Sequence, residues 1–293
     1  MLQECLENVK KMTPLIHCIT NYVTAGDVAN MLLACGAKPI MADEPKEAAE
    51  ITACAAGLAM NLGTPGERTV AAMHIAGRRA NELGHPVLFD PVGVGASVFR
   101  QESAKELLSA LHFDVIRGNV TEIKMIYKLY HALFDRHIGE EKAFGTDAVI
   151  EKASGVDALA SDAVTEGKLS DAVAFVKMAA SELHSIVAVT GAVDLISDGM
   201  LCYVIRGGRE VMSRVTGTGC QLSGLMTAFA AANPGNMLTA ALAASCTMKA
   251  AGEIAWRNLT EEEGNASYRN RMIDAVYRMD GDTLERMADY EVR

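Results

Sequence analysis

Val215-Thr216-Gly217-Thr218-Gly219-Cys220 runs directly into residues 221–232, QLSGLMTAFAAA, whose small and apolar composition predicts a helix. Two glycines at the start of a helix turn backbone N–H groups outward, and the helix dipole adds positive charge at the same place. A phosphate or another anion fits there. Cys220 would lie beside that anion, in a first helical turn that favours the thiolate. We interpret this stretch, called the glycine loop below, as an anion site; the alternative is a Gly-rich turn with a buried cysteine.

The composition is that of a globular protein. The chain has 293 residues, of which 50% are hydrophobic and 22% charged, enough for one large α/β domain or two small ones. Its net charge of −10 argues against a nucleic-acid partner, because phosphate backbones are bound by clustered Lys and Arg. There is no run of 18 apolar residues and no basic leader, so we expect no membrane segment.

The chain has seven cysteines, at positions 5, 18, 35, 54, 202, 220 and 246. The number is odd, the spacing is irregular and no C-x-x-C pair occurs. A disulfide framework and a zinc ribbon are therefore disfavoured, and we expect a reducing, cytoplasmic location.

Short apolar runs alternate with amphipathic stretches, a pattern that predicts a largely parallel sheet with helices on both faces. The expected strands are Leu15–Ile19, Lys38–Met41, Gly57–Asn61, 86–89, 114–116 and Ile186–Val189, with helices near 25–35, 45–53, 66–83, 101–111 and 169–183.

The second half should begin with a hairpin. Runs 193–197 and 201–206 flank Asp198-Gly199, which is typical of a type I′ turn. A further run at 211–215 would lead into the glycine loop, and only helices are expected after it. Residues 131–165 are polar and aperiodic, which indicates a surface excursion with a short helix or two. With no linker and no repeat, we predict a single domain over 1–293.

Polar residues follow the expected strands. Because ligands of open parallel sheets bind beyond the carboxyl ends of the strands, these residues should share one edge. They are Thr20-Asn21, Asp43-Glu44, Asn61 to Thr64, Asp90 to Gly95, Arg117 to Glu122 and Thr190-Gly191. Asp90 and Glu122 could hold Mg²⁺ beside a phosphate, since Mg²⁺ takes one or two carboxylates, waters and phosphate oxygens. The alternatives are a turn cap for Asp90, a helix cap for Asn119 with Glu122, and a surface ion pair for Arg117.

Several common sites are excluded. No G-x-x-x-x-G-K-[ST] occurs, and no G-x-G-x-x-G follows the first strand, so P-loop and Rossmann nucleotide sites are disfavoured. No closely spaced histidines support a transition-metal site.

At this point the chain closely resembles the hydroxyethylthiazole kinase family, within the ribokinase-like superfamily. The matching stretches keep the family's order over residues 14–232: PLIHCITN at 14–21, GAKPIMA at 36–42, NLGT at 61–64, DPVGVGA at 90–96, IRGN at 116–119, Glu122, VTG at 189–191 and the glycine loop. Other ribokinase-like enzymes resemble one another in having aspartate where this family, like this chain, has cysteine.

The resemblance implies a homotrimer with active sites between subunits, in which ATP and Mg²⁺ phosphorylate the alcohol of 4-methyl-5-(2-hydroxyethyl)thiazole for thiamine biosynthesis. Carried over by position, the thiazole would contact Met41, Gly217 and Asn21; ATP would contact Arg117, Thr190 and Gly219; the metal would be served by Asp90 and Glu122. Cys220 would stand where the superfamily keeps its catalytic base.

Cys220 is an awkward base, because an alcohol is far less acidic than a thiol and a neighbouring γ-phosphate disfavours a thiolate. We expect it to orient the alcohol and to accept its proton late. Three other functions remain open: a kinase of another small alcohol such as hydroxymethylpyrimidine or a sugar, a hydrolase or acyltransferase with Cys220 as nucleophile, and a nucleotide-binding module without turnover.

Overall fold

The structure is a computed structural model that describes residues 1–134 and 166–293. The excursion expected at 131–165 lies outside the described residues, apart from 131–134, which end a helix.

A nine-stranded sheet forms the centre, in the order β2-β1-β3-β4-β5-β6-β7-β8-β9. The strands are β1 (Leu15–Ile19), β2 (Lys38–Met41), β3 (Gly57–Asn61), β4 (Val87–Asp90), β5 (Val115–Gly118), β6 (Ile186–Val189), β7 (Asp194–Ser197), β8 (Cys202–Ile205) and β9 (Tyr290–Val292). Strands β1 to β6 pair in parallel, and β7 to β9 continue the sheet antiparallel. The prediction of a central, largely parallel sheet is confirmed.

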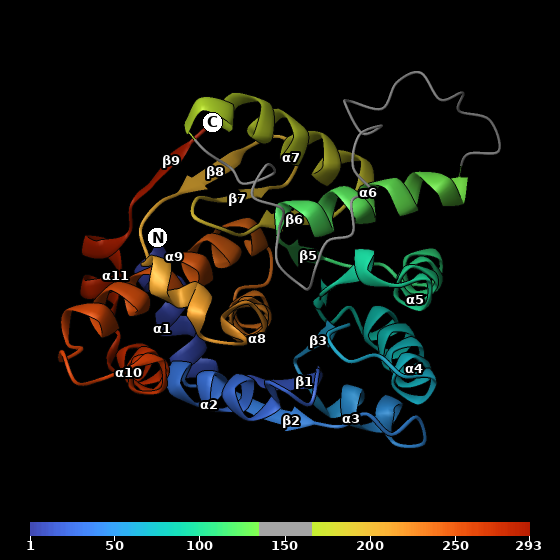
Figure 1. The fold of residues 1–293 in the computed structure, drawn as a ribbon. Coiled ribbons are helices and arrows are strands. Elements are labelled where there is room, and N and C mark those ends of the chain that lie inside the picture. The colour runs from blue at the N-terminus through green and yellow to red at the C-terminus, as the bar shows by residue number, and fades with distance from the viewer. Residues whose placement is uncertain (135–165) are drawn as a thin grey trace.

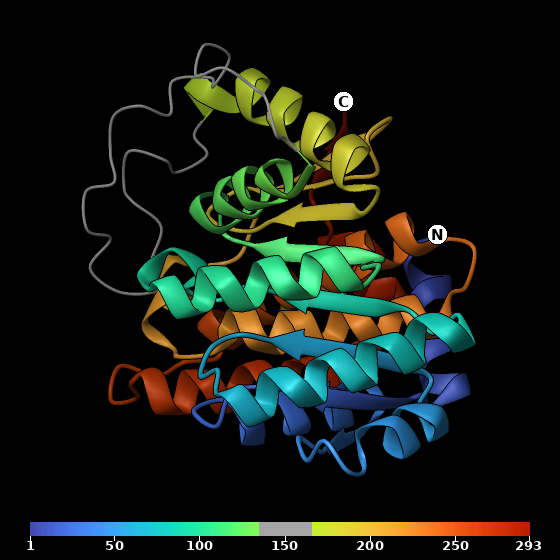
Figure 2. The same cartoon turned by 90° about the vertical axis from the view of Figure 1, so that its right-hand side faces the viewer.

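Helices cover both faces of this sheet (Figures 1 and 2). One face carries α1 (Leu2–Met12), α2 (Ala25–Cys35), α8 (Thr218–Ala232), α9 (Met237–Arg257), α10 (Asn265–Arg278) and α11 (Gly281–Met287). The other carries α3 (Ala48–Cys54), α4 (Glu67–Leu83), α5 (Val98–Ala110), α6 (Val120–Phe134) and α7 (Leu169–Leu183). Three short 3₁₀ turns complete the described part: η1 (Val94–Ala96), η3 (Glu166–Lys168) and η4 (Glu210–Arg214).

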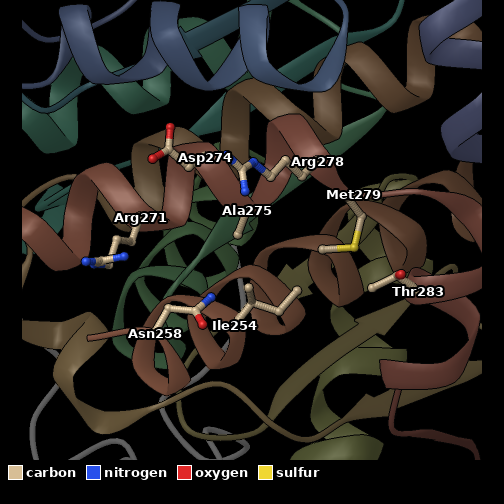
Figure 3. Close-up of a pocket in the computed structure, with 8 residues that line it drawn as sticks. All are labelled: Ile254, Asn258, Arg271, Asp274, Ala275, Arg278, Met279 and Thr283. Atoms are coloured by element: carbon tan, nitrogen blue, oxygen red, sulfur yellow. The ribbon is translucent and has the colours of Figure 1, made fainter. Parts of the chain in front are cut away.

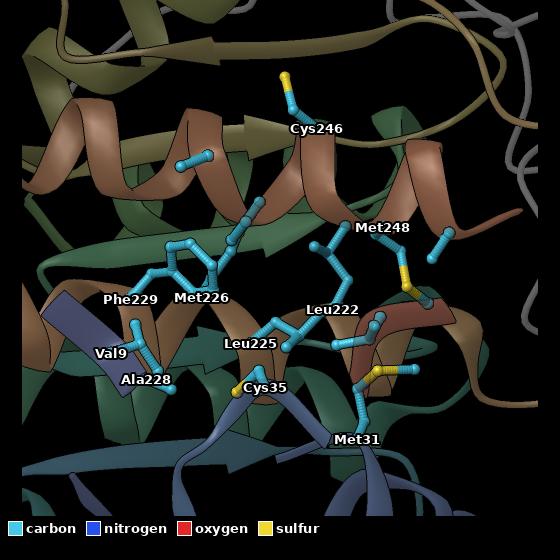
Figure 4. Close-up of a cluster of buried hydrophobic side chains, with 14 of the residues drawn as sticks. Val9, Met31, Cys35, Leu222, Leu225, Met226, Ala228, Phe229, Cys246 and Met248 are labelled. Atoms are coloured by element: carbon cyan, nitrogen blue, oxygen red, sulfur yellow. The ribbon is translucent and has the colours of Figure 1, made fainter. Parts of the chain in front are cut away.

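Each face has its own hydrophobic cluster, and α8 lies at the centre of one of them. Figure 4 shows Leu222, Leu225 and Phe229 of α8 packed between the helices around it. Each of these side chains is at most 5% exposed, and burying one contributes about 1.5–3 kcal/mol. Gly224 allows α2 to come close, because a Cβ there would lie 3.1 Å from Val28. The helix is therefore held firmly in the core while its first turn reaches the sheet edge.

Three expectations for the second half are wrong. Residues 211–215 do not form a strand: η4 occupies Glu210–Arg214, none of its residues is buried, and within residues 1–134 and 166–293 no strand pairs with it. The hairpin loop has four residues, 198–201, of which only Gly199 has positive φ, whereas a type I′ turn needs two. The last element is a strand, β9, because residues 290–292 pair with β8.

The amino-terminal helix α1 was not expected from the sequence. Its Leu2, Leu6 and Val9 are fully or almost fully buried against the same cluster as α8. Within residues 1–134 and 166–293, no helix is both long and apolar enough to cross a bilayer.

Candidate active site

The site lies where the parallel strands end. Asn61 and Asp90, the last residues of β3 and β4, are register partners, and Arg117 lies one residue before the end of β5. The sheet therefore brings three polar side chains together at its carboxyl edge, as the strand ends predicted. Helix α8 begins at the same edge, with Gly217 as its N-cap.

The two glycines of the glycine loop are required for different reasons. Gly217 has φ +83°, and a Cβ there would lie 2.4 Å from Cγ2 of Thr24. Gly219 has no special φ, but a Cβ there would lie 2.5 Å from Nη1 of Arg117. Removing both side chains lets Thr24 and the Arg117 guanidinium lie against the backbone at the positive end of α8. This arrangement suits an anion with more than one charge.

Asp90 is fully buried and uses only one of its oxygens. Oδ2 accepts hydrogen bonds from Nδ2 of Asn61 at 2.8 Å and Oγ of Ser223 at 2.7 Å, and Nη1 of Arg117 lies 3.4 Å away. Oδ1 has no partner within the described residues. Burial raises the pKa of Asp90, while Arg117 and the two neutral donors oppose that rise. A buried carboxylate oxygen with no donor is where a cation or its bound water would fit.

Glu122 stands in the first turn of α6 and caps two loops. Its Oε1 accepts from the Gly93 backbone at 2.8 Å and its Oε2 from the Asn119 backbone at 2.7 Å, while Oδ1 of Asn119 accepts from the Glu122 backbone at 2.9 Å. This is a reciprocal capping box, so the helix-cap interpretation is also correct. Burial, and next the charge of Asp90, raise the pKa of Glu122 to about 7.

Burial raises the pKa of both carboxyl groups, so a nearby cation would stabilise their charged forms. The described residues contain no cluster of three or more His, Cys, Asp or Glu able to hold a metal by themselves. Asp90 and Glu122 therefore fit Mg²⁺, which keeps waters and takes its remaining ligands from substrate phosphates, better than Zn²⁺.

Cys220 accepts two amide donors. Nδ2 of Asn21 and Nδ2 of Asn61 each lie 3.3 Å from its sulfur. Even so, burial and then the charge of Asp90 raise the pKa of the Cys220 thiol. Burial and the charge of Asp90 therefore oppose the thiolate that a helix start favours.

Arg117 is 9% exposed, so the alternative of a surface ion pair is wrong. Besides Asp90, its guanidinium contacts the hydroxyl of Thr190, which follows β6, and its Nε has no partner among the described residues. The Thr190 backbone is fixed by a 2.9 Å hydrogen bond to the carbonyl of Gly118. A positive group thus joins β5, β6 and the glycine loop.

Met41 stands apart from this network. It ends the edge strand β2, is 38% exposed, and has Cys18 of β1 as its register partner. The loop after β1 is also exposed and apolar, with Tyr22 at 83% and Val23 at 57%.

Ser223 and Arg100 were not singled out from the sequence, and Asn61 was noted only as a strand end. Asn61 and Ser223 orient Asp90, and Arg100 of α5 donates to the carbonyls of Val92 and Gly63, at 2.7 Å each, and of Leu62. Ser223 could have been found, because it lies three residues after Cys220 and so on the same helix face. Arg100 could not, since nothing local links it to the strand ends.

A separate hollow lies between α9, α10 and α11 (Figure 3). It shares no residue with the carboxyl edge. Its charged groups are Arg271, which is paired with Glu263 at 2.7 Å, Asp274 and Arg278. It therefore adds nothing to the phosphate site.

Comparison with known proteins agrees with this geometry. The model of the hydroxyethylthiazole kinase family matches residues 6–282. The hydroxyethylthiazole kinase of Clostridium acetobutylicum is 45% identical over 291 residues, which cover 99% of each protein. A solved structure of hydroxyethylthiazole kinase from Pyrococcus horikoshii matches with a TM-score of 0.82 and 32% identity, over 100% of this chain and 98% of that one. A ribokinase-like superfamily protein from Enterococcus faecalis, 12% identical, matches with a TM-score of 0.57 over 92% and 89% of the two chains, which concerns the fold alone and confirms the expected architecture.

Proposed function

The chain belongs to the hydroxyethylthiazole kinase family, and from this premise we infer that it transfers the γ-phosphoryl group of ATP to the hydroxyl of 4-methyl-5-(2-hydroxyethyl)thiazole, a step of thiamine salvage. The observation that carries the assignment is the position of the Arg117 guanidinium, which lies against the glycine loop at the start of α8. The same guanidinium lies 3.4 Å from Oδ2 of Asp90, whose Oδ1 has no partner among the described residues. An anion site and a cation site adjoin there, as phosphoryl transfer requires.

The triphosphate occupies the glycine loop. Backbone N–H groups at Gly219 and the α8 dipole stabilise the γ-phosphoryl oxygens, and Arg117 and Thr190 bind the phosphates from the β5 and β6 side. Support comes from the contact that Arg117 would make with any side chain at position 219, which places the guanidinium at the loop itself.

Asp90 and Glu122 hold Mg²⁺, directly or through water. The ion would neutralise charge on the phosphates. Support comes from the free Oδ1 of Asp90 and from the raised pKa of both carboxyl groups, each of which a nearby cation would lower.

The alcohol lies on the other side of the loop, near Gly217 and Asn21. Its oxygen attacks the γ-phosphorus, the bond from that phosphorus to the β–γ bridging oxygen breaks, and ADP leaves. Because the pKa of Cys220 is raised, the thiol is protonated at neutral pH and cannot remove a proton at the outset. Cys220 instead orients the hydroxyl as a neutral thiol, and the proton of the alcohol leaves late, to solvent.

We propose a homotrimer in which Met41 contributes to a neighbouring subunit's alcohol site. Tyr22 and Val23 are exposed in the loop after β1, Met41 at the end of β2, and Leu33 in the last turn of α2, the helix between these strands. Exposed apolar groups near a ligand site are typical of an interface. All seven cysteines are free thiols, which suits the cytoplasm, where ATP is available.

One experiment tests the function. The purified protein is incubated with ATP, Mg²⁺ and hydroxyethylthiazole, and the product is identified by mass spectrometry, with hydroxymethylpyrimidine, pyridoxal and a sugar as competing acceptors. We expect a mass gain of one phosphoryl group on the thiazole alcohol and the highest kcat/KM for it. A higher kcat/KM for another acceptor would overturn the substrate assignment. ATP binding with no acceptor phosphorylated would overturn the kinase assignment itself.

A further inference from the structure

One face of helix α9 carries three residues that touch the loops around the nucleotide site. Ser245, Lys249 and Gly252 follow one another at spacings of four and three, so they lie on the same side of the helix. All three are buried. None of them is needed for the chemistry proposed above, and a buried lysine is costly unless it is paired.

Lys249 holds the loop that follows β6. Its Nζ donates to the carbonyls of Gly191 at 2.8 Å and Ala192 at 3.1 Å, and lies 3.2 Å from Oδ1 of Asp194. These contacts begin at the residue directly after Thr190.

Asp194 completes the arrangement from the start of β7. Its Oδ1 accepts from the Gly191 backbone at 2.9 Å, and its Oδ2 accepts from Oγ of Ser245 at 2.6 Å. Asp194 is 2% exposed and Lys249 9% exposed. A buried ion pair therefore fixes both the N–H and the carbonyl of Gly191, and with them the position of Thr190.

The same helix face supports the segment that leads into the glycine loop. Gly208 has φ +79°, and a Cβ there would lie 3.0 Å from Cδ of Lys249. A Cβ on Gly252 would lie 2.5 Å from Sδ of Met212, and the Met212 carbonyl accepts from Oγ1 of Thr218 at 3.4 Å. One helix face thus sets the loop that carries Thr190 and the chain that enters the glycine loop.

The alternative is that the Lys249–Asp194 ion pair only stabilises the fold. Buried ion pairs are weak stabilisers, because the cost of desolvation offsets most of the attraction, and an apolar side chain of similar volume is often as good. Such a pair can instead fix geometry, because the Lys249 ammonium group orients two backbone carbonyls and the Asp194 carboxylate at the same time. That is useful where Thr190 and the glycine loop must bind the same triphosphate.

We propose that Lys249, with Asp194 and Ser245, is a positioning residue for ATP: it keeps the Thr190 loop in register with the glycine loop. The proposal rests on the function inferred above. The alcohol is bound near Gly217 and Asn21. Among the described residues, no hydrogen bond joins Lys249, Asp194 or Ser245 to either of them. Substituting these residues should therefore weaken ATP binding and leave the binding of the alcohol almost unchanged.

The test uses Lys249→Met, which keeps length and removes charge, and Ser245→Ala, which removes only the hydrogen bond to Asp194. Thr247→Val is the matched control, because Thr247 is equally buried in α9 but bonds only to the carbonyl of Ala243 in its own helix, at 2.7 Å. ATP dissociation constants are measured by calorimetry, KM is measured for each substrate, and folding is checked by circular dichroism and melting temperature.

We expect Lys249→Met to raise the ATP dissociation constant roughly tenfold or more and Ser245→Ala to raise it about two- to fivefold, with KM for the alcohol changed less than about twofold. The double variant should be less than additive, since both changes act through Asp194. If Lys249→Met does not fold, Ser245→Ala alone decides. An ATP dissociation constant equal to that of Thr247→Val, or equal losses for both substrates, would overturn the proposal.

Direct ATP binding separates this proposal from the function on which it rests. If the unmodified protein binds ATP and phosphorylates no thiazole alcohol, the function fails while the binding measurements still judge Lys249. If it is an active thiazole kinase whose Ser245 and Lys249 variants bind ATP normally, the positioning role fails alone.

Discussion

Nδ2 of Asn61 donates a 2.8 Å hydrogen bond to Oδ2 of Asp90, its register partner on the adjacent strand. The same nitrogen lies 3.3 Å from the sulfur of Cys220. One amide thus joins β3, β4 and α8, and with Ser223 it turns the other oxygen of Asp90 toward the proposed metal.

Asn61→Ala should reduce kcat/KM most at limiting Mg²⁺, on the order of tenfold, and less at saturating Mg²⁺, because Asp90 loses the donor that orients it. Mg²⁺ titrations of initial rates measure this. Asn81→Ala is the control: Asn81 exchanges two hydrogen bonds with the backbone of His112 on the exposed surface. A loss that is the same at every Mg²⁺ concentration would contradict the orienting role.

Cys220→Ala should lower kcat by about 100-fold or less, since a protonated thiol only orients the alcohol. Cys220→Asp should keep or raise the activity, because a carboxylate can accept the proton. Steady-state kinetics with circular dichroism measure both. Complete loss in a folded alanine variant that still binds ATP would restore Cys220 as an essential group. Activity without ATP that iodoacetamide abolishes stoichiometrically would favour the hydrolase alternative instead.

Gly219→Ala should affect ATP binding, whereas Gly217→Ala should affect the stability of the fold. The new methyl group at 219 meets the far end of the flexible Arg117 side chain, so the variant should fold normally and raise KM for ATP roughly tenfold. At 217 it meets Thr24 and also requires φ +83°, so that variant should lose about 1–3 kcal/mol of stability. Denaturant unfolding and ATP kinetics separate the two. A Gly219→Ala variant with unchanged KM for ATP would remove Arg117 from the phosphate site.

The rate should depend on pH through Glu122. Its pKa is raised to about 7, so the carboxyl group becomes neutral as the pH falls through that value and binds Mg²⁺ less well. At limiting Mg²⁺, kcat/KM should therefore fall between about pH 8 and pH 6. At saturating Mg²⁺ the fall should move to lower pH, because a bound cation lowers the pKa of its ligand. Glu122→Gln should lose this acid limb together with most of the activity. If the pH at which kcat/KM falls does not change with Mg²⁺ concentration, a group other than Glu122 causes the fall.

Charge placed on the exposed apolar side should break the proposed trimer. Leu33 of α2 is 55% exposed, and Leu33→Glu should leave the fold intact but shift the mass in light scattering from trimer to monomer. Activity should then depend on protein concentration. Leu83→Glu is the control, since Leu83 is also exposed, at 38%, but lies on α4 over the opposite face. A monomeric unmodified protein with full activity would refute the trimer.

The strand ends could be predicted because apolar runs and polar stops are local signals, and parallel pairing brings the stops to one edge. Asp90, Arg117 and Thr190 were found in that way. The protonation of Cys220 could not be predicted, since burial by α2 and the neighbouring strand ends is a tertiary effect. The prediction of a strand at 211–215 was wrong because an alternating run forms a strand only if another strand pairs with it. Asn61 was noticed as a strand end, but its role depends on its register with Asp90.

Helix α8 begins at the proposed phosphate site and is buried along almost its whole length. A ligand at its first turn would therefore be attached to a helix that is packed in the hydrophobic core. Ligand binding should slow hydrogen exchange throughout the domain, and the α8 amides should be the last to exchange with deuterium. It follows that the melting temperature, which each ligand raises according to its concentration relative to its dissociation constant, can serve as a screen for acceptor alcohols without any radioactive or coupled assay.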